Sequence, residues 1–136
     1  TEKFEPTIDA TRRLKRKVSN VVSVPITVDM ESGFGKTPDE VAEAVAQIIN
    51  VGAIGMNIED GSNPPEQLAA KIQAVRKAAE RAHVKFFVNA RVDVYLRQLV
   101  PPAERVAESL RRATIYRDAG ADGVLTYFAR DVARLL

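Results

Sequence analysis

Two carboxylates stand two residues apart at the end of an apolar run near the start of the chain. Asp29 and Glu31 follow residues 24–28, which have the composition of a short buried strand. Side chains two residues apart in a strand point to the same side, so both carboxylates are expected to face one space. Two such carboxylates repel each other and call for either a shared proton or a hard cation. We take the cation as the working hypothesis.

Polar side chains also mark the ends of the next two apolar runs, which cover 53–58 and 84–90. Oxygen ligands from several strands suit Mg²⁺ or Mn²⁺, with water and substrate oxygens completing the octahedron. The planar guanidinium of Arg91 could bind a substrate carboxylate or phosphonate. A purely structural alternative is that the acids pair with Arg91 and cap the following helices. The residues concerned are Glu59, Asp60, Asn89, Arg91 and Asp93.

The elements that must position these residues alternate between strands and helices. Thr37 to Glu40 has the pattern of a capping box, with proline at the first helical position. The pattern at 63–66 repeats this start signal, and Gly52 and Gly120 are placed to end helices. Strands are predicted over 24–28, 53–58, 84–90 and 121–126. Helices are predicted over 7–23 and 38–52. A third helix is predicted from the start signal at 63–66 to about 82, and a fourth from the Pro101–Pro102 linker to 120. A last helix is predicted to begin near 131.

Apolar residues at helical spacing predict the buried face of three of these helices. The residues predicted to face inward are Val41, Val45, Ile48 and Ile49; then Leu68, Ile72, Val75 and Ala79; then Val106, Leu110 and Ala113.

The absence of tight hairpins favours a parallel sheet built from right-handed crossovers. Repeated βα units with polar residues after the strands predict a (β/α)8 TIM barrel, an α/β fold whose active sites lie at the carboxyl ends of the strands. A doubly wound sheet competes, but no G-x-G-x-x-G pattern follows the first strand. We therefore predict about four βα units of a barrel, in one domain over 1–136. Either the barrel is incomplete, or a second copy covers the open edges of the sheet.

The composition excludes several classes of function. The 136 residues carry a net charge of +2 and no cysteine, which excludes disulfides and thiolate chemistry within this chain. No membrane helix or signal peptide is visible, so a cytoplasmic setting is expected. The cluster of basic residues at 12–17 lacks interleaved aromatic residues, and we interpret it as a solvated helix face. We expect neither a nucleic-acid nor a membrane partner.

Three blocks of sequence together resemble the isocitrate lyase/phosphoenolpyruvate mutase superfamily. The GADG pattern at 120–123 also fits, and the resemblance covers nearly the whole chain. The blocks are Asp29-x-Glu31-x-Gly33-Phe34-Gly35, Gly52-Ala53-x-Gly55-x-x-Ile58-Glu59-Asp60 and Asn89-Ala90-Arg91-x-Asp93.

The resemblance implies a Mg²⁺-dependent lyase or mutase that breaks or forms a C–C or P–C bond beside the carbonyl of a 2-oxo acid, through a metal-stabilised enolate. It implies that Asp29 binds the metal directly and that Glu31 and Glu59 hold metal-bound waters. Arg91 and Glu59 are the implied catalytic residues, while Arg91, Asn89 and Gly33 are the implied substrate-binding residues. The expected partners are a small 2-oxo acid or dicarboxylate and further copies of the chain in a homo-oligomer.

The sequence also departs from the family pattern. The isocitrate and methylisocitrate lyases carry a Lys-Lys/Arg-Cys-Gly-His loop where this chain has residues 61–65 and no cysteine. Isocitrate lyase activity is therefore not expected. The first two and last two strands of the family barrel have no counterpart here. The alternative is thus a non-catalytic half-barrel fragment that keeps the metal-site residues without a closed active site.

Overall fold

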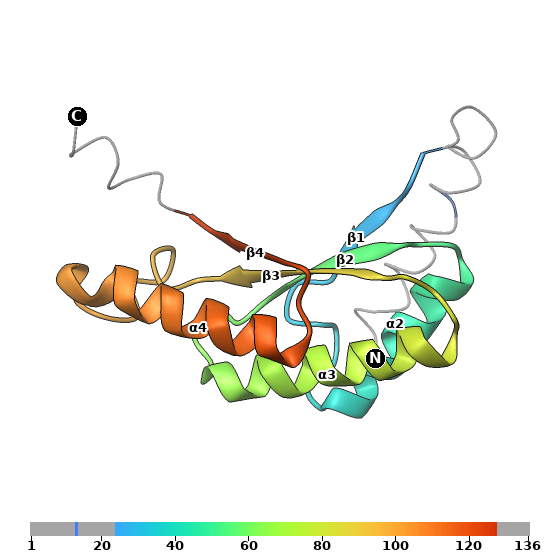
Figure 1. Cartoon of the computed structure of the whole chain (residues 1–136), viewed down its shortest axis with the longest axis horizontal. Coiled ribbons are helices and arrows are strands. Elements are labelled where there is room, and N and C mark those ends of the chain that lie inside the picture. The colour runs from blue at the N-terminus through green and yellow to red at the C-terminus, as the bar shows by residue number, and fades with distance from the viewer. Residues whose placement is uncertain (1–12, 14–23, 128–136) are drawn as a thin grey trace.

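The computed structural model describes residues 13 and 24–127 of the chain. Four strands alternate with helices along this part of the chain (Figure 1). The elements are β1 (Thr27–Asp29), α2 (Pro38–Asn50), β2 (Gly55–Glu59), α3 (Pro65–Arg81), β3 (Phe87–Val92), the short 3-10 helix η1 (Pro102–Glu104), α4 (Arg105–Ala119) and β4 (Gly123–Thr126).

The four strands form one sheet in the order β1-β2-β3-β4, and every neighbouring pair is parallel. The helices α2, α3 and α4 all lie on the same side of this sheet (Figure 1). This arrangement confirms the predicted parallel βα units. It also leaves the opposite face of the sheet without a covering layer in the described part of the chain.

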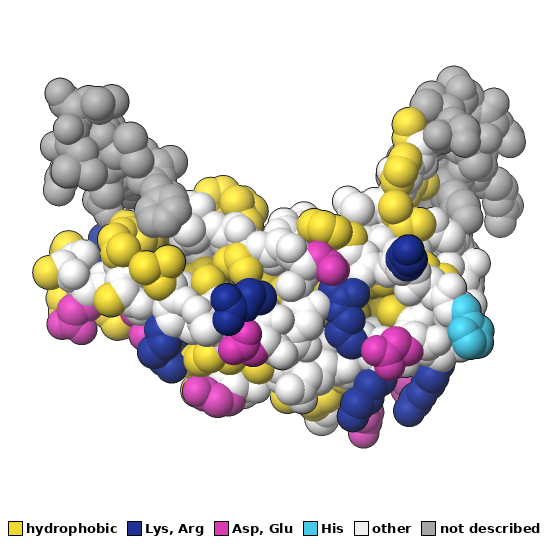
Figure 2. Space-filling model, in the orientation of Figure 1, with side chains coloured by type: hydrophobic (Ala, Val, Ile, Leu, Met, Phe, Trp, Pro, Cys, Tyr) yellow, Lys and Arg dark blue, Asp and Glu magenta, His cyan; other side chains and the backbone are white. Residues whose placement is uncertain are grey.

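Alternation along each strand separates an apolar face from a polar one. In β2, Met56 and Ile58 are buried beneath the helices, whereas Asn57 is exposed on the other face. In β3, Val88 and Ala90 are likewise buried. Side chains two residues apart share a face, so the intervening polar residues gather on the open side. On that side hydrophobic side chains are also exposed, whereas charged ones gather over the helices (Figure 2).

Each strand begins two or three residues later than the sequence predicted. The reason is shared by three of the strands, because a residue two or three positions after each preceding helix still donates its backbone N–H to that helix. Ala53 donates to Ile48 O at 3.0 Å, and Val84 donates to Ala79 O at 3.1 Å. The equivalent bond joins Ala121 N–H to the carbonyl of residue 116 at 2.9 Å. These bonds satisfy helix carbonyls that would otherwise lack partners, and they delay entry into the sheet.

Helix α2 begins as its sequence predicted. The Thr37 hydroxyl accepts the Glu40 N–H at 3.3 Å, and the Glu40 carboxylate accepts the Thr37 N–H at 3.1 Å, which completes the capping box. The start of α3 is different. Its N-cap is Pro64, and the Asn63 side chain donates to the Asp60 carbonyl at 3.2 Å instead of capping the helix. The predicted inward residues of α2 and α3 are all buried.

The predicted inward face of α4 is wrong. Val106 is 55% exposed and Leu110 is 64% exposed, and Ala113 is only half-buried. The helix instead turns Arg112 and Tyr116 toward the sheet. These two side chains meet a buried carboxylate at the end of β2, and burial of a carboxylate requires hydrogen-bond donors around it. The hydrogen-bond donors needed by this buried carboxylate, Asp60, therefore explain which face of α4 is buried.

Some predictions fall outside the described residues. These are the helix over 7–23, the basic cluster at 12–17 apart from Arg13, and the helix from near 131. The described part of the chain contains no helix long and apolar enough to span a bilayer.

The contrast between α3 and α4 gives a stability prediction. Leu68→Ala removes a side chain that is 3% exposed, so we expect a loss of about 2–5 kcal/mol in the free energy of unfolding. Leu110→Ala removes the same atoms from an exposed position and should change that free energy by less than about 0.5 kcal/mol. Urea unfolding of both variants measures the difference. Equal losses would contradict the observed orientation of α4.

Candidate active site

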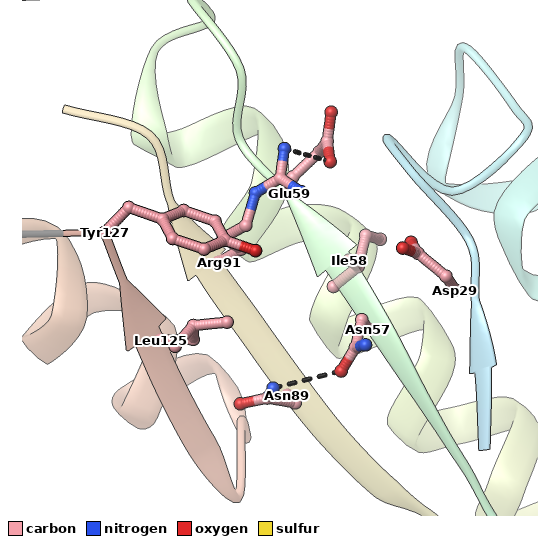
Figure 3. Close-up of a pocket in the computed structure, with 8 residues that line it drawn as sticks. All are labelled: Asp29, Asn57, Ile58, Glu59, Asn89, Arg91, Leu125 and Tyr127. Carbon is pink, nitrogen blue, oxygen red and sulfur yellow. Dashed lines mark hydrogen bonds and ion pairs between the residues drawn. The ribbon is translucent and has the colours of Figure 1, made fainter. Parts of the chain in front are cut away.

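A small pocket lies on the open face of the sheet, at the carboxyl ends of the strands (Figure 3). The pocket is small and partly open to solvent. All four strands or the residues just after them contribute to it. The lining residues are Asp29, Asn57, Ile58, Glu59, Asn89, Arg91, Leu125 and Tyr127.

The parallel register explains why these residues meet. Asp29 lies opposite Asn57, and Asn57 lies opposite Asn89. One pleat further along, Glu59 lies opposite Arg91. The pocket is therefore built from two successive layers of inward positions, as expected at the carboxyl-terminal mouth of a barrel.

The two asparagines of the lower layer bind each other. Asn89 Nδ2 donates to Asn57 Oδ1 at 3.0 Å (Figure 3). Gly123 leaves room for this pair, because a Cβ atom at that position would lie 2.9 Å from Asn89 Oδ1. Sequence reasoning singled out Asn89 but missed Asn57. The available signal was its spacing of two residues from Glu59, which places both on one face of β2.

Arg91 is held by acids on two sides. Its Nη2 forms an ion pair with Glu59, and its Nε and Nη2 donate to the Asp93 carboxylate at 2.7 and 3.1 Å. The hydrogen bonds that Arg91 donates to Asp93 raise the pKa of Arg91, so its charge is permanent. The Tyr127 ring lies 5.7 Å from the guanidinium carbon, within cation–π range. The pairing predicted by the structural alternative is therefore present for Glu59 and Asp93.

Glu59 carries an electrostatic cost in this position. Burial raises its pKa above the ordinary value of 4.5, and the neighbouring carboxylates of Asp93 and Asp29 raise it further, although Arg91 acts in the opposite direction. Its charged form is thus less favourable here than in water. A positive charge added between Asp29 and Glu59 would relieve this cost.

The donor set fits a hydrated Mg²⁺ ion. Asp29 is exposed at the pocket and has no ion-pair partner in the part of the chain described here. Mg²⁺ commonly takes one or two protein carboxylates and fills its other positions with water and substrate oxygens. Among the described residues, no three His, Cys, Asp or Glu side chains converge into a protein-only cage for a metal. Asp29 and Glu59 are the two carboxylates among the described residues that line the pocket.

Glu31 and Gly33 do not line the pocket. Glu31 lies in a turn after β1 with a φ of 49°, so the alternation of a strand does not apply to its side chain. Its backbone nevertheless joins the two pocket acids, because its N–H donates to Asp29 Oδ1 at 3.1 Å and its carbonyl accepts the Glu59 N–H at 2.8 Å. Gly33 has a φ of 102° and packs so closely that a Cβ atom would lie 2.8 Å from Val41. The functional roles of both residues stay predictions.

Comparison with known proteins gives the family. Residues 3–135 match the family model described as phosphoenolpyruvate phosphomutase. The chain belongs to this family. Its four described strands and three described α-helices are accordingly part of the (β/α)8 barrel predicted from the sequence, and the predicted superfamily is confirmed.

Relatives of this chain carry different activities in their names. The chain is 31% identical over 118 residues to 2-methylisocitrate lyase of Salmonella typhimurium, covering 79% of this chain and 38% of the relative. It is 30% identical over 129 residues to phosphonopyruvate hydrolase of Variovorax sp., covering 84% and 42%. The crystal structure of 2,3-dimethylmalate lyase matches with a TM-score of 0.73 and 27% identity, covering 95% and 46%. The chain thus spans about two fifths of the length of its curated relatives.

Replacement of Glu59 and of Glu108 should change the free energy of unfolding with opposite signs as pH rises. In metal-free buffer, Glu59→Gln should gain stability relative to the unchanged protein as pH rises above 4.5, because the raised pKa makes charged Glu59 unfavourable. Glu108 on α4 is the matched case, since hydrogen bonds from Arg111 and then Arg112 lower its pKa to about 2. Glu108→Gln should therefore lose stability at neutral pH, and this loss should vanish as pH falls from 4.5 toward 2.

Urea unfolding of the three proteins between about pH 2 and pH 7 measures both effects. Changes of the same sign in the two variants would show that the environments of these glutamates are not as described.

Proposed function

We propose that this chain carries the metal and substrate site of a Mg²⁺-dependent lyase or phosphonomutase-type enzyme. The reaction would break or form a C–C or P–C bond beside the carbonyl of a small 2-oxo acid or a related dicarboxylate. The observation that carries the proposal is one pocket in which Asp29 and Glu59 face a permanently charged arginine, Arg91. A whole protein acting as a cytoplasmic homo-oligomer remains our expectation from composition and family.

Asp29 would bind the ion directly, and Glu59 and Glu31 would hold its water ligands. Mn²⁺ is the alternative ion, because it accepts the same oxygen donors. When bound, the ion supplies positive charge that stabilises negative charge developing on the keto oxygen of the acid. The repulsion between Asp29 and Glu59, which a bound cation would reduce, supports this assignment.

Arg91 would bind the carboxylate or phosphonate group of the acid. Its Nε and Nη2 are engaged by Asp93 and Glu59, which fixes the plane of the guanidinium. Its Nη1 takes part in none of these contacts and would be the nitrogen that a substrate meets. Asn89 would orient the same substrate through its side-chain amide, which already binds Asn57 at 3.0 Å.

The proposed chemistry is not that of an isocitrate lyase. That activity requires a cysteine in the loop after β2, and this chain contains no cysteine. In its place, the segment at 61–65 leads through Pro64 into α3. Phosphonopyruvate and oxaloacetate are suitable trial substrates, since each is a small 2-oxo acid.

One observation favours the second candidate, a non-catalytic half-barrel. The charge of Arg91 is already balanced by Glu59 and Asp93, and the pocket opens on the face of the sheet that the described helices do not cover. Such a protein would keep the site residues without binding metal and acid together. Ligand binding separates the two candidates directly.

Addition of Mg²⁺ with oxalate, which mimics the enolate of a 2-oxo acid, should raise the melting temperature of the chain. At a free oxalate concentration of 100 times Kd the stabilisation is about 2.7 kcal/mol. Asp29→Ala should abolish the shift because it removes the direct ligand. The control is Asp39→Ala, which removes an exposed acid from the first turn of α2 and should leave the shift intact.

Thermal unfolding followed by circular dichroism measures these shifts. An unchanged melting temperature in the unaltered chain would favour the half-barrel. An equal shift in Asp29→Ala would remove Asp29 from the metal site.

A further inference from the structure

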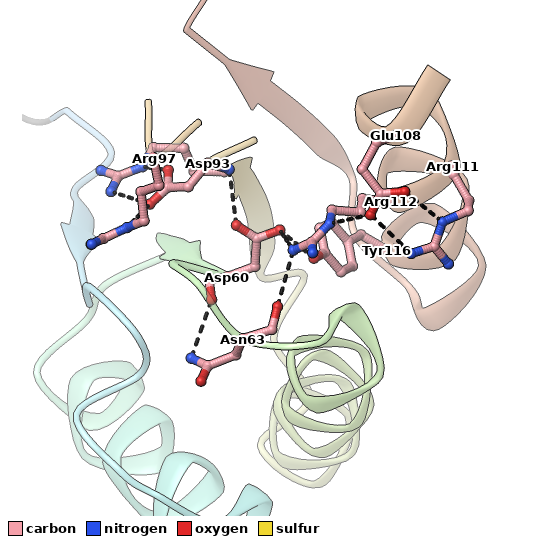
Figure 4. Close-up of polar contacts among 9 residues, drawn as sticks. Asp60, Asn63, Asp93, Arg97, Glu108, Arg111, Arg112 and Tyr116 are labelled. Atoms are coloured by element: carbon pink, nitrogen blue, oxygen red, sulfur yellow. Dashed lines mark hydrogen bonds and ion pairs between the residues drawn. The ribbon is translucent and has the colours of Figure 1, made fainter. Parts of the chain in front are cut away.

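A chain of buried and half-buried polar side chains runs from α4 to the pocket. It begins with Glu108 on α4, passes through Arg112 to Asp60 at the end of β2, and continues to Asp93 after β3 (Figure 4). Asp60 is 2% exposed and Asp93 is fully buried, yet neither lines the pocket. The proposed function assigns no role to Asp60, Arg112 or Tyr116.

Asp60 contacts β3 on both sides of a single residue. Its backbone N–H donates to the Arg91 carbonyl at 3.2 Å. Its side-chain Oδ1 accepts the Asp93 N–H at 2.9 Å. Asp60 thus fixes the backbone that precedes and follows Val92, and it does so from the neighbouring strand.

The other oxygen of Asp60 is held by α4. Its Oδ2 accepts Arg112 Nη1 at 2.8 Å and the Tyr116 hydroxyl at 2.5 Å (Figure 4). Arg112 also donates to the Asn63 carbonyl at 3.0 Å and to Glu108 at 2.8 Å. Both oxygens of the Asp60 carboxylate therefore accept hydrogen bonds, and these bonds fix the orientation of the side chain.

Asp93 links Asp60 to the side chain of Arg91 in the pocket. Its carboxylate accepts two hydrogen bonds from Arg91, and it accepts a third from Arg97 Nε at 3.2 Å. The orientation of the Arg91 fork thus follows from the position of the Asp93 backbone. That position in turn follows from Asp60.

The network is an expensive way to stabilise a fold. Buried charges lose hydration, and well-packed apolar residues of similar volume often stabilise a protein equally well or better. What the polar network supplies is direction, because each hydrogen bond constrains the angle of its partner. This favours a positioning role over a purely stabilising one.

We propose that Asp60, held by Arg112 and Tyr116, is a positioning residue that orients Arg91 through Asp93. The importance of this orientation for ligand binding rests on the proposed function, whereas the immobilisation of Arg91 does not. The two parts are therefore tested by different measurements.

The immobilisation is tested by NMR on ¹⁵N-labelled chain without metal or ligand. The heteronuclear NOE of Arg91 Nε–H, assigned through Arg91→Lys, should match that of rigid backbone amides. In Asp60→Asn it should fall to the value of an exposed arginine such as Arg81. The matched control is Asp122→Asn at the opposite ends of the strands, where Asp122 pairs with Arg76 and accepts the Val88 N–H at 2.8 Å. This control should leave the Arg91 signal unchanged.

Tyr116→Phe is the milder variant, because it removes only one hydroxyl donor to Asp60. It decides the outcome if circular dichroism shows that Asp60→Asn does not fold. An Arg91 Nε–H that stays as rigid as before, in whichever of these variants is folded, would overturn the proposal.

Ligand binding tests the functional part. Asp60→Asn should weaken oxalate binding in the presence of Mg²⁺ by about tenfold to a hundredfold, the range found when partners of site residues are removed. In an Arg91→Lys background the same substitution should have no further effect on Kd, because the two residues act as one unit. Equal weakening in both backgrounds would overturn a role through Arg91. Failure of the unaltered chain to bind oxalate would instead refute the proposed function and leave the NMR result standing.

Discussion

The uneven covering of the sheet is the constraint on which the site depends. All three described α-helices pack on one face, so the alternation of each strand sends apolar side chains to that face and polar ones to the other. Parallel pairing then aligns the polar positions across neighbouring strands, as Glu59 and Arg91 show. Because parallel strands end at the same edge, three aligned strands bring carboxylates, amides and a guanidinium together without any contribution from long loops.

The pocket combines two kinds of charge compensation. Arg91 is balanced within the protein by Asp93 and Glu59, whereas Asp29 has no ion-pair partner in the described part of the chain. Burial raises the pKa of Glu59, and the carboxylates of Asp93 and Asp29 raise it further, although Arg91 and Arg97 act in the opposite direction. The charged form of Glu59 is therefore less favourable here than in water, and the proposed cation would stabilise it.

Much of the fold could be predicted from the sequence because its signals are local. Thr37 and Glu40 define the start of α2, and the apolar spacing of α2 and α3 identifies their buried faces. The face of α4 could not be predicted in this way. Its orientation depends on Asp60, which is 52 residues away in sequence from Arg112. Likewise Glu31 was predicted from the alternation of a strand that ends two residues earlier.

The division of the site between inner and edge strands matters for its behaviour. Arg91, Glu59 and their polar supports belong to β2 and β3, each of which has a neighbouring strand on both sides. Asp29 belongs to β1, and Tyr127 follows β4; these two strands form the edges of the described sheet. An edge strand has fewer contacts to fix its side chains than an inner one. Arg91, which we propose binds the substrate, thus lies in the most constrained part of the described sheet. Asp29, the proposed direct metal ligand, lies on β1, where the position of the backbone depends most on what packs beside that strand.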